Sequence, residues 1–432
     1  MNESSCRDMK ITFLFSCCVA KLFEDMLMNR RKRKKCILWS MVVSVFLIMM
    51  LVAAVRHALF ASRIICSTHD ILHNHITQLC EEVENDAKLL HGHTLSDQEL
   101  CKELCVPDVP SRIMCHTFHL NKPAVFTLNG SSKKVIKSVI KLEEREEPID
   151  ETPAEQDEVY WKLKSGNQYF PTKDDLLSMV NIYISNFVGN DVDRDIISKL
   201  LNLSNLYHSE TETLASHRNF WFLIQDHEFL TSYVFEKLQL FPSVLGTCGT
   251  YYSMQYLQPL TDNPLLPFEL TWRKRLWKAL DIIKYLGQLE TVWREPLHLC
   301  DVKHDHFGWN NEGKVMFLDL DSVLPETSLL RTMENTPQCV DNDDCSYFDC
   351  KGRCHHRISK CELMRTNTNL QVICDKIFLG NTEGLFSLYG LLVSHEANEE
   401  LKEALELCKT NKGMTVDGMM DVLTKASNAL LY

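Results

Sequence analysis

The feature that most constrains this chain is a run of 20 residues without a single charge, Cys36–Val55. A helix rises about 1.5 Å per residue, so this run is long enough to cross the hydrocarbon core of a bilayer. The basic residues Arg30–Lys35 stand directly before it and favour a cytosolic N-terminus. We therefore expect a type II protein with a cytosolic basic tail at 1–35, a signal-anchor helix at 36–55 and a lumenal remainder. A cleaved signal peptide is the alternative, but its apolar core would be shorter and nearer the start of the chain.

The charge of the chain is unevenly distributed. The formal net charge is -12, yet residues 1–35 hold nine Lys/Arg against four Asp/Glu, which leaves 37 basic and 54 acidic residues elsewhere. Binding to phosphate backbones requires a basic face, and the main body of this chain is acidic. The composition thus argues against nucleic acid as a partner.

Cysteine usage indicates an oxidising compartment. Fourteen of the 18 cysteines follow the uncharged run, an even number at a density typical of disulfide-bonded proteins. The disulfide candidates fall in a cysteine-rich stalk at 56–115 and in a block at 339–374: Cys66, Cys80, Cys101, Cys105, Cys115, Cys339, Cys345, Cys350, Cys354, Cys361 and Cys374. Zinc is the alternative for the block, because His355 and His356 stand among its cysteines. No Cys-x₂-Cys pair occurs there, so disulfides are favoured.

Two Asn-x-Ser sequons lie on the expected lumenal side, at Asn129 and Asn202. Both are glycosylation candidates, although such triplets are also common by chance. They are consistent with the topology that the uncharged run predicts.

Apolar periodicity predicts a mixture of helices and hairpins. One hairpin is expected at Ala124–Leu128 and Val135–Ile140 around the turn Asn129–Ser132, and a second at Phe307–Trp309 and Val315–Leu318. Helices are expected at 71–90, 220–240 and 272–289, and strands at 244–257.

The stretch from Asp301 to Asp319 carries the most informative constellation. Protein kinases place a base Asp, a Lys two residues later, an Asn five residues later that ligates the metal, and a metal-binding Asp after the next hairpin. Here Asp301, Lys303 and His306 hold the first three places, and Asp319 follows the second hairpin. Asp301 would accept the hydroxyl proton, Lys303 would neutralise charge on the transferring phosphoryl group, and Asp319 would hold the cation.

A strand lysine and a helix glutamate complete the predicted nucleotide site. Lys137 in Val135–Lys137 resembles the kinase lysine that grips the α- and β-phosphates, and Lys141 is its rival. Glu228, in the helix expected at 220–240, is the predicted partner. An exposed lysine and an exposed helix glutamate are the alternatives.

Three departures from the kinase pattern argue against catalysis. No Gly-x-Gly-x-x-Gly precedes Lys137, and Asn129–Ser132 is the turn we assign there. Leu299-Cys300 replaces the His-Arg before the base, so a phosphorylated loop would lack its cationic partner. His306 replaces the metal-binding Asn, and an imidazole suits Mn²⁺ or Zn²⁺ better than Mg²⁺.

These residues resemble the divergent protein kinase domain 1 family of cysteine-rich type II membrane proteins of the endoplasmic reticulum. The resemblance extends over about residues 60–430 and is carried by His298–Lys303, Val315–Asp321, Cys345–Cys350 and most strongly Asn369–Phe378. It implies a protein-kinase-like fold with a long insert before the Glu228 helix, and residence in the membrane of the endoplasmic reticulum.

The expected fold is α+β: a protein-kinase-like, two-lobed lumenal domain after a single N-terminal transmembrane helix. We expect an N-lobe-like region at 116–257 and a C-lobe-like region at 258–432, the latter containing the cysteine-rich block. As an enzyme it would bind ATP with Mg²⁺ or Mn²⁺ and phosphorylate a hydroxyl of a lumenal protein or glycan. The alternatives are a pseudokinase that acts as a membrane-anchored scaffold, and a disulfide-rich adaptor in which Asp301 and Asp319 serve only as loop residues.

Overall fold

The computed structural model describes thirteen stretches and single residues of the compact unit Cys66–Tyr432. They are 70–89, 99–117, 123–130, 132–141, 163–164, 167–168, 173–188, 200, 220, 222–260, 270–380, 389–410 and 413–429. No helix within these stretches is both long and apolar enough to cross a membrane. The span predicted at 36–55 lies outside them.

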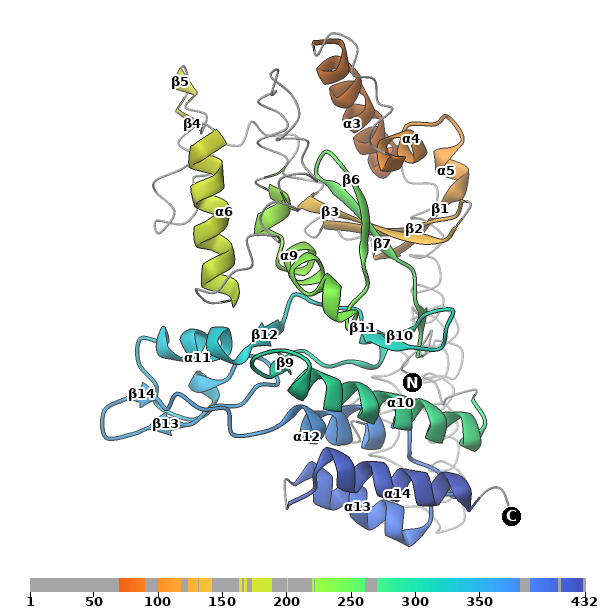
Figure 1. The fold of residues 1–432 in the computed structure, drawn as a ribbon, viewed down its shortest axis with the longest axis vertical. Coiled ribbons are helices and arrows are strands. Elements are labelled where there is room, and N and C mark those ends of the chain that lie inside the picture. Colours follow the sequence, from red (N-terminus) through yellow and green to blue (C-terminus); the bar gives the residue numbers. More distant parts are fainter. Residues whose placement is uncertain are drawn as a thin grey trace, which may run out of the picture. The chain divides into compact units, whose positions relative to one another are not determined.

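A five-stranded antiparallel sheet dominates the first half of the described residues (Figure 1). Its spatial order is β1-β2-β3-β7-β6. The strands are β1 (Ile113–Thr117), β2 (Pro123–Leu128), β3 (Lys134–Lys141), β6 (Val244–Cys248) and β7 (Tyr251–Gln255). Both predicted strand regions are confirmed: β2 pairs with β3, and β6 pairs with β7 across a turn where Gly249 has φ +56°.

Strand alternation decides which way each side chain of β3 points. Ile136 is fully buried in a cluster with Phe126 and Leu128, whereas Val139 packs against the larger core on the other side of the sheet. Successive residues of a strand face opposite sides. Lys137, between Ile136 and Ser138, therefore points away from the first cluster.

Three helices cover the Ile136 face of the sheet: α3 (Asp70–Leu89), α4 (Glu99–Leu104) and α5 (Val109–Arg112). The disulfides Cys80–Cys105 and Cys101–Cys248 tie α3 to the end of α4 and α4 to β6. The stalk boundary predicted at residue 115 falls inside β1. The described part of the predicted stalk is therefore packed onto the sheet.

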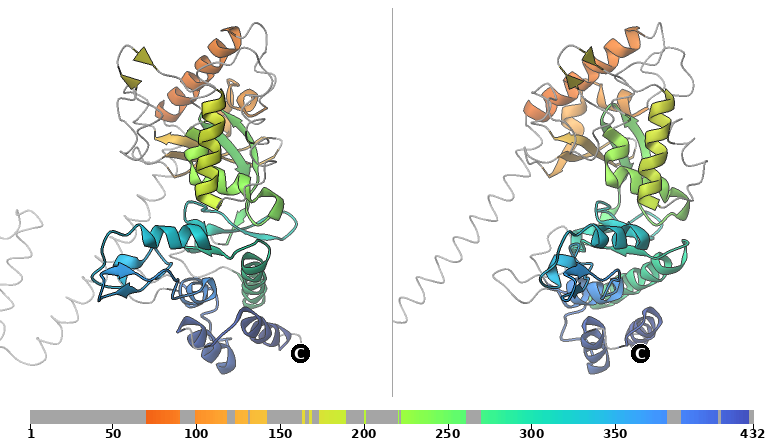
Figure 2. Two further views of the ribbon diagram at one scale, coloured as in Figure 1. Left: turned by 60° about the vertical axis from the view of Figure 1, so that its left-hand side comes forward. Right: turned by 90° about the vertical axis from the view of Figure 1, so that its left-hand side faces the viewer.

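The helix predicted at 220–240 is wrong in two respects, because it is interrupted at Asp226 and ends at Val234, before a separate 3-10 turn at Glu236–Leu238. The Asp226 carboxylate accepts a hydrogen bond from the Phe229 backbone N–H at 2.7 Å, which makes it the N-cap of a new helix, α9 (His227–Val234). Helix α6 (Lys173–Val188) lies beside α9 (Figure 2), with the Phe187 and His227 rings in edge contact at 4.7 Å. The described part of the expected insert thus supports the helix that carries Glu228.

Helices and short strands make up the second half. The helices are α10 (Trp272–Thr291), α11 (Glu326–Glu334), α12 (Asn369–Ile373), the π-helical turn η9 (Cys374–Leu379), α13 (Glu399–Lys409) and α14 (Val416–Asn428). The strands are β8 (Gln258–Pro259), β9 (Leu297–Leu299), β10 (Phe307–Trp309), β11 (Val315–Phe317) and β12 (Val323–Pro325). The predicted helix at 272–289 and the second predicted hairpin, β10–β11, are confirmed. The remaining two-residue strands are β4 (Leu163–Lys164) and β5 (Asn167–Gln168), which pair with each other, and β13 and β14 in the cysteine-rich block.

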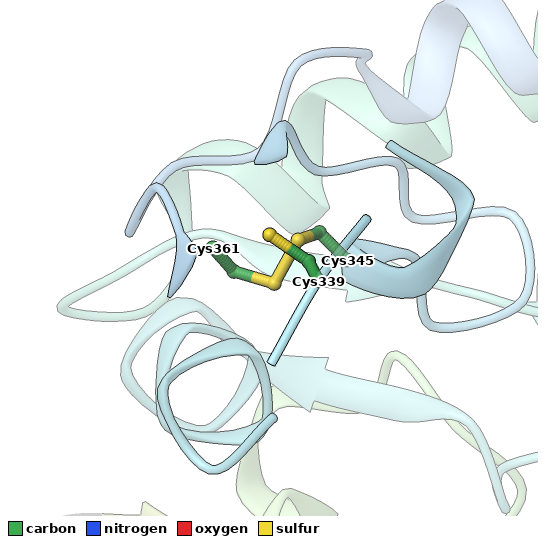
Figure 3. Close-up of side chains that lie close together, drawn as sticks. All are labelled: Cys339, Cys345 and Cys361. Carbon is green, nitrogen blue, oxygen red and sulfur yellow. A yellow bond between two sulfur atoms is a disulfide. The ribbon is translucent and has the colours of Figure 1, made fainter. Parts of the chain in front are cut away.

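The cysteine-rich block is held by disulfides. Cys339–Cys354 and Cys345–Cys361 bracket the hairpin of β13 (Cys354–His355) and β14 (Lys360–Cys361). Figure 3 shows Cys339, Cys345 and Cys361 converging at the centre of the block. Four cysteines are the whole of its local apolar cluster. Because these sulfurs are oxidised, the structure favours cross-links over a thiolate zinc site.

Nine of the eleven predicted disulfide candidates are bonded, but three partners were not predicted. Cys300 pairs with Cys350, Cys374 with Cys408, and Cys248 with Cys101. The side chains of Cys66 and Cys115 and the sequon at Asn202 lie outside the described residues. Asn129 is exposed at the end of β2, and its glycosylation stays a prediction.

Candidate active site

The ion pair between Lys137 and Glu228 links the sheet to α9. The two side chains are in direct contact, and Glu228 is 6 % exposed. The structure therefore joins Lys137, and not its rival Lys141, to the glutamate; the side chain of Lys141 lies outside the described residues. Helix α9 is fixed in turn by His227, whose Nε2 lies 3.1 Å from the carbonyl oxygen of Val323 in β12.

Burial and neighbouring charges strongly perturb this pair. Desolvation raises the pKa of Glu228, and the nearby ammonium of Lys137 opposes this shift by favouring the carboxylate. Desolvation alone would lower the pKa of Lys137, but the carboxylates of Glu228, Asp319 and Asp321 raise it overall. The carboxylates of the site thus stabilise the protonated, charged form of Lys137.

The loop after β9 places the predicted base. Lys303 donates from Nζ to Oδ2 of Asp301 at 2.7 Å, and His306 Nδ1 lies 2.9 Å from the Asp301 carbonyl oxygen. Desolvation opposes the charge of Lys303, yet its hydrogen bond to Asp301 raises its pKa. Lys303 and His306, the two residues predicted to act beside the base, therefore both contact Asp301 within the loop.

Asp319 lies between the loop and the ion pair. Its Oδ2 is 3.1 Å from Nε2 of His306, and its charge also acts on Lys137. Donor atoms of Asp301, His306 and Asp319 lie within 4.8 Å of one another, as do those of Glu228, Asp319 and Asp321. Asp319 thus belongs to both groups, which connects all the predicted site residues.

Asp321 has no role in the sequence prediction, although it lies in one of the segments that carry the family resemblance. The signal was available: in an extended chain, alternate residues such as Asp319 and Asp321 point to the same side. The residue as a whole is exposed, but partial desolvation of its carboxylate and repulsion from Asp319 and Asp226 raise its pKa. Crowded carboxylates of this kind favour a bound cation.

The donor set fits a divalent metal ion. Carboxylate oxygens from Asp319 and Asp321 are the hard ligands that Mg²⁺ and Mn²⁺ prefer, and the imidazole of His306 shifts the preference towards Mn²⁺. Asp319 would hold the ion either with His306 and Asp301 or with Asp321 and Glu228, because these are the two groups whose donor atoms lie within 4.8 Å of one another.

Helix α12 fixes the strand that leads into the loop. Asn369 is buried; its side chain accepts from Leu299 N at 3.0 Å and donates to Leu297 O at 2.8 Å. The Asn369 oxygen also accepts a bond from Arg365, which contacts Nδ1 of His298 at 2.8 Å. Sequence reasoning gave Asn369 no role, because its partners are backbone atoms about 70 positions away.

The predicted hairpin turn at Asn129–Ser132 does not correspond to the glycine-rich loop of a kinase. Asn129–Ser132 joins β2 to β3, and Arg112 donates from Nε to the Asn129 carbonyl there at 2.8 Å. In a kinase, the loop that covers the phosphates joins the first two strands. The corresponding residues, 118–122, lie outside the described stretches and contain no glycine.

A five-stranded antiparallel sheet with a lysine–glutamate pair, followed by a base loop and an acidic hairpin end, is the arrangement of a protein-kinase-like domain. In agreement, residues 220–411 match the family model described as the protein-kinase domain of FAM69. The resemblance to a divergent, protein-kinase-like family that the sequence indicates is therefore confirmed over these residues.

Proposed function

We propose that this two-lobed, protein-kinase-like domain binds ATP with Mg²⁺ or Mn²⁺ and transfers the γ-phosphoryl group to a hydroxyl of a secretory-pathway protein or glycan. One observation carries the proposal. The buried Lys137–Glu228 pair and the base Asp301 both lie next to Asp319, which shares a donor cluster with each. A lysine, a cation-binding aspartate and a base are the parts that phosphoryl transfer requires.

Each side chain has a defined task in this reaction. The acceptor oxygen attacks the γ-phosphorus, its proton passes to Asp301, and the bond to the bridging oxygen breaks to release ADP. Lys137 holds the α- and β-phosphates. Lys303, which donates a hydrogen bond to Asp301, is placed to neutralise charge on the phosphoryl group. A divalent ion on Asp319 and Asp321, when bound, supplies neutralisation of the phosphate oxygens.

The location we propose is the lumen of the endoplasmic reticulum, behind a single span at 36–55. Six disulfides among the described residues support an oxidising compartment. Protease added to sealed microsomes should spare residues 57–432. Digestion of that part would overturn the topology and leave the proposed chemistry untouched.

The activity is tested by incubating the full chain in detergent with γ-labelled ATP and a mixture of secreted glycoproteins. We expect label on an acceptor hydroxyl, and a loss of roughly 10²–10⁴-fold in the Asp301→Asn variant, which lacks the base. The variant should still bind ATP. Equal labelling by the wild-type chain and the variant would contradict the assignment of the base.

A pseudokinase is the second candidate, and the contact between His306 and Asp319 favours it. An imidazole 3.1 Å from the cation-binding carboxylate occupies the place of an amide oxygen, and it is a poorer partner for Mg²⁺ than an oxygen ligand is. ATP binding without transfer to any acceptor would support this function, a membrane-anchored scaffold that responds to nucleotide.

A further inference from the structure

The residues on either side of the predicted base are tied to one other residue, Asp349. The Asp349 N–H donates to the Cys300 carbonyl oxygen at 2.6 Å, and the Val302 N–H donates to Oδ2 of Asp349 at 2.7 Å. Those two groups belong to the peptide bonds that precede and follow Asp301. Asp349 therefore holds both peptide planes that flank the base, and none of its hydrogen bonds or ion pairs among the described residues involves the base carboxylate itself.

A disulfide reinforces the same connection. Cys350, the residue after Asp349, is bonded to Cys300, the residue before Asp301. Tyr347 and Cys350 exchange backbone hydrogen bonds at 2.9 and 3.0 Å, which closes a tight turn around Asp349. The cysteine-rich block is thus joined to the base loop by a covalent bond and two hydrogen bonds within a few residues.

Asp349 is itself fixed from a third element. Lys376 in η9 lies 2.5 Å from Oδ1 and 2.7 Å from Oδ2 of its carboxylate, and Asn367 donates to its carbonyl oxygen at 2.8 Å. The Asp349 side chain is 14 % exposed, and that of Lys376 is 39 % exposed. Such a partly buried, hydrogen-bonded pair keeps its geometry better than an exposed pair does.

We infer that Asp349 is a positioning residue, which sets the place of Asp301 from the segment where a kinase carries its activation loop. In kinases of the usual pattern, the Arg before the base pairs with a phosphorylated residue of that loop. In this chain Cys300 stands before the base, and the Cys300–Cys350 disulfide together with Asp349 joins the base loop to that segment. The base loop is accordingly held in place without phosphorylation of the segment.

The inference rests on the proposed function, since a positioning residue has a catalytic meaning only if Asp301 acts as a base. Asp349 contacts the base loop and not the residues proposed to bind nucleotide and metal. Among the described residues, no hydrogen bond or ion pair joins Asp349 to Lys137, Glu228 or Asp319. Loss of Asp349 should therefore change the rate of transfer much more than the binding of nucleotide.

The test compares Asp349→Ala, Asp349→Asn and a matched control, Asp375→Ala, in the full chain. Asp375 lies on η9 beside Lys376 and pairs with Lys409 at 2.9 Å, with its side chain 48 % exposed, so its loss removes a more exposed ion pair away from the base loop. A misplacement of about 1 Å costs roughly 100-fold in rate. We expect Asp349→Ala to lower kcat by that factor while the KM for ATP stays within about threefold.

The conservative variant distinguishes positioning from folding. Asparagine keeps an oxygen that accepts from the Val302 N–H, and it loses the charge that Lys376 binds. Asp349→Asn should therefore recover a large part of the lost kcat. An unchanged kcat in Asp349→Ala, or an equal loss in the Asp375→Ala control, would overturn the inference.

Hydrogen exchange provides a readout that does not depend on activity. Asp349→Ala should accelerate exchange over residues 301–305, whereas Asp375→Ala should leave that peptide unchanged. If the wild-type chain transfers no phosphate, the proposed function fails, and hydrogen exchange still decides whether Asp349 holds the loop. Unchanged exchange in Asp349→Ala would refute the positioning role in either case.

Discussion

Nε2 of His306 lies 3.1 Å from Oδ2 of Asp319, at the place where a kinase would have an asparagine amide beside the metal-binding carboxylate. The other ring nitrogen, Nδ1, lies 2.9 Å from the Asp301 carbonyl oxygen. One imidazole thus joins the base loop to the acidic end of the β10–β11 hairpin. Of the departures from the kinase pattern, this ring bears most directly on which metal ion the site prefers.

The first prediction concerns the choice of metal ion. His306→Asn replaces the imidazole by an amide oxygen, a ligand that Mg²⁺ prefers. We expect the ATP-induced thermal shift to be larger with Mn²⁺ than with Mg²⁺ in the wild-type chain, and the order to reverse or equalise in the variant. If the variant kept the wild-type order of metals, His306 would have no part in the metal site.

The second prediction concerns the Lys137–Glu228 pair. Removing one partner of a buried pair leaves the other charge unpaired, so Glu228→Ala should lower the free energy of unfolding by about 3–5 kcal/mol. Replacing both partners by methionine should cost less than the single change, because no unpaired charge remains. Urea unfolding measures both variants.

An exposed pair provides the control for that experiment. Lys402 and Glu399 are 2.7 Å apart on α13, with side chains 48 % and 80 % exposed. Exposed pairs contribute little, so Glu399→Ala should change stability by no more than about 0.5 kcal/mol. A similar cost for Glu228→Ala would show that the Lys137–Glu228 contact is not a buried ion pair in solution.

The third prediction concerns pH. Desolvation, followed by repulsion from Arg365, lowers the pKa of His298 to about 3 in the folded chain, from a model-peptide value of 6.5. Between pH 6.5 and pH 3, His298 is therefore protonated in the unfolded chain but not in the folded chain. Because the unfolded chain binds this proton, the free energy of unfolding falls as the pH falls from 6.5 towards 3. Between pH 7 and pH 5, this histidine should account for a loss of about 2 kcal/mol.

The measurement compares urea unfolding of the wild-type chain and of His298→Gln at pH 7 and pH 5. Glutamine does not titrate, so the variant should lose about 2 kcal/mol less on acidification than the wild-type chain. His227 and His304 also have lowered pKa values because they are buried, and they contribute equally to both curves. Equal pH dependence in both proteins would contradict the burial of a neutral His298.

How much of this site could be predicted from the sequence depends on the range of each interaction. Asp301, Lys303, His306 and Asp319 were found because they lie within one loop and one hairpin, where spacing determines geometry. Lys137 and Glu228 required the kinase comparison, since 91 positions separate them.

Residues whose partners are distant backbone atoms could not be found in this way. Asp349 and Asn369 make hydrogen bonds to backbone groups of residues 297–302. Every residue except proline offers the same backbone groups, so no residue type in the sequence marks such a partner. The same limit explains the unpredicted disulfide partner Cys300. It was interpreted as the loss of an arginine, whereas its role follows from where Cys350 lies in the fold.

The fourth prediction concerns the cysteine-rich block. Its apolar cluster consists of Cys339, Cys345, Cys354 and Cys361, so the two disulfides are its main source of order. Reduction should increase hydrogen exchange throughout 339–361, and a zinc chelator added without reductant should have no effect. Protection that survives reduction and disappears with the chelator would identify a zinc site instead.

The central claim, a metal-dependent nucleotide site, is tested most directly by thermal shift of the full chain in detergent. The melting temperature is measured with ATP plus Mg²⁺ or Mn²⁺, for the wild-type chain, for Asp319→Ala and for the Asp375→Ala control. We predict a metal-dependent rise in melting temperature for the wild-type chain and the control, and its loss in Asp319→Ala. No rise with either metal, or an equal rise in Asp319→Ala, would contradict the nucleotide site.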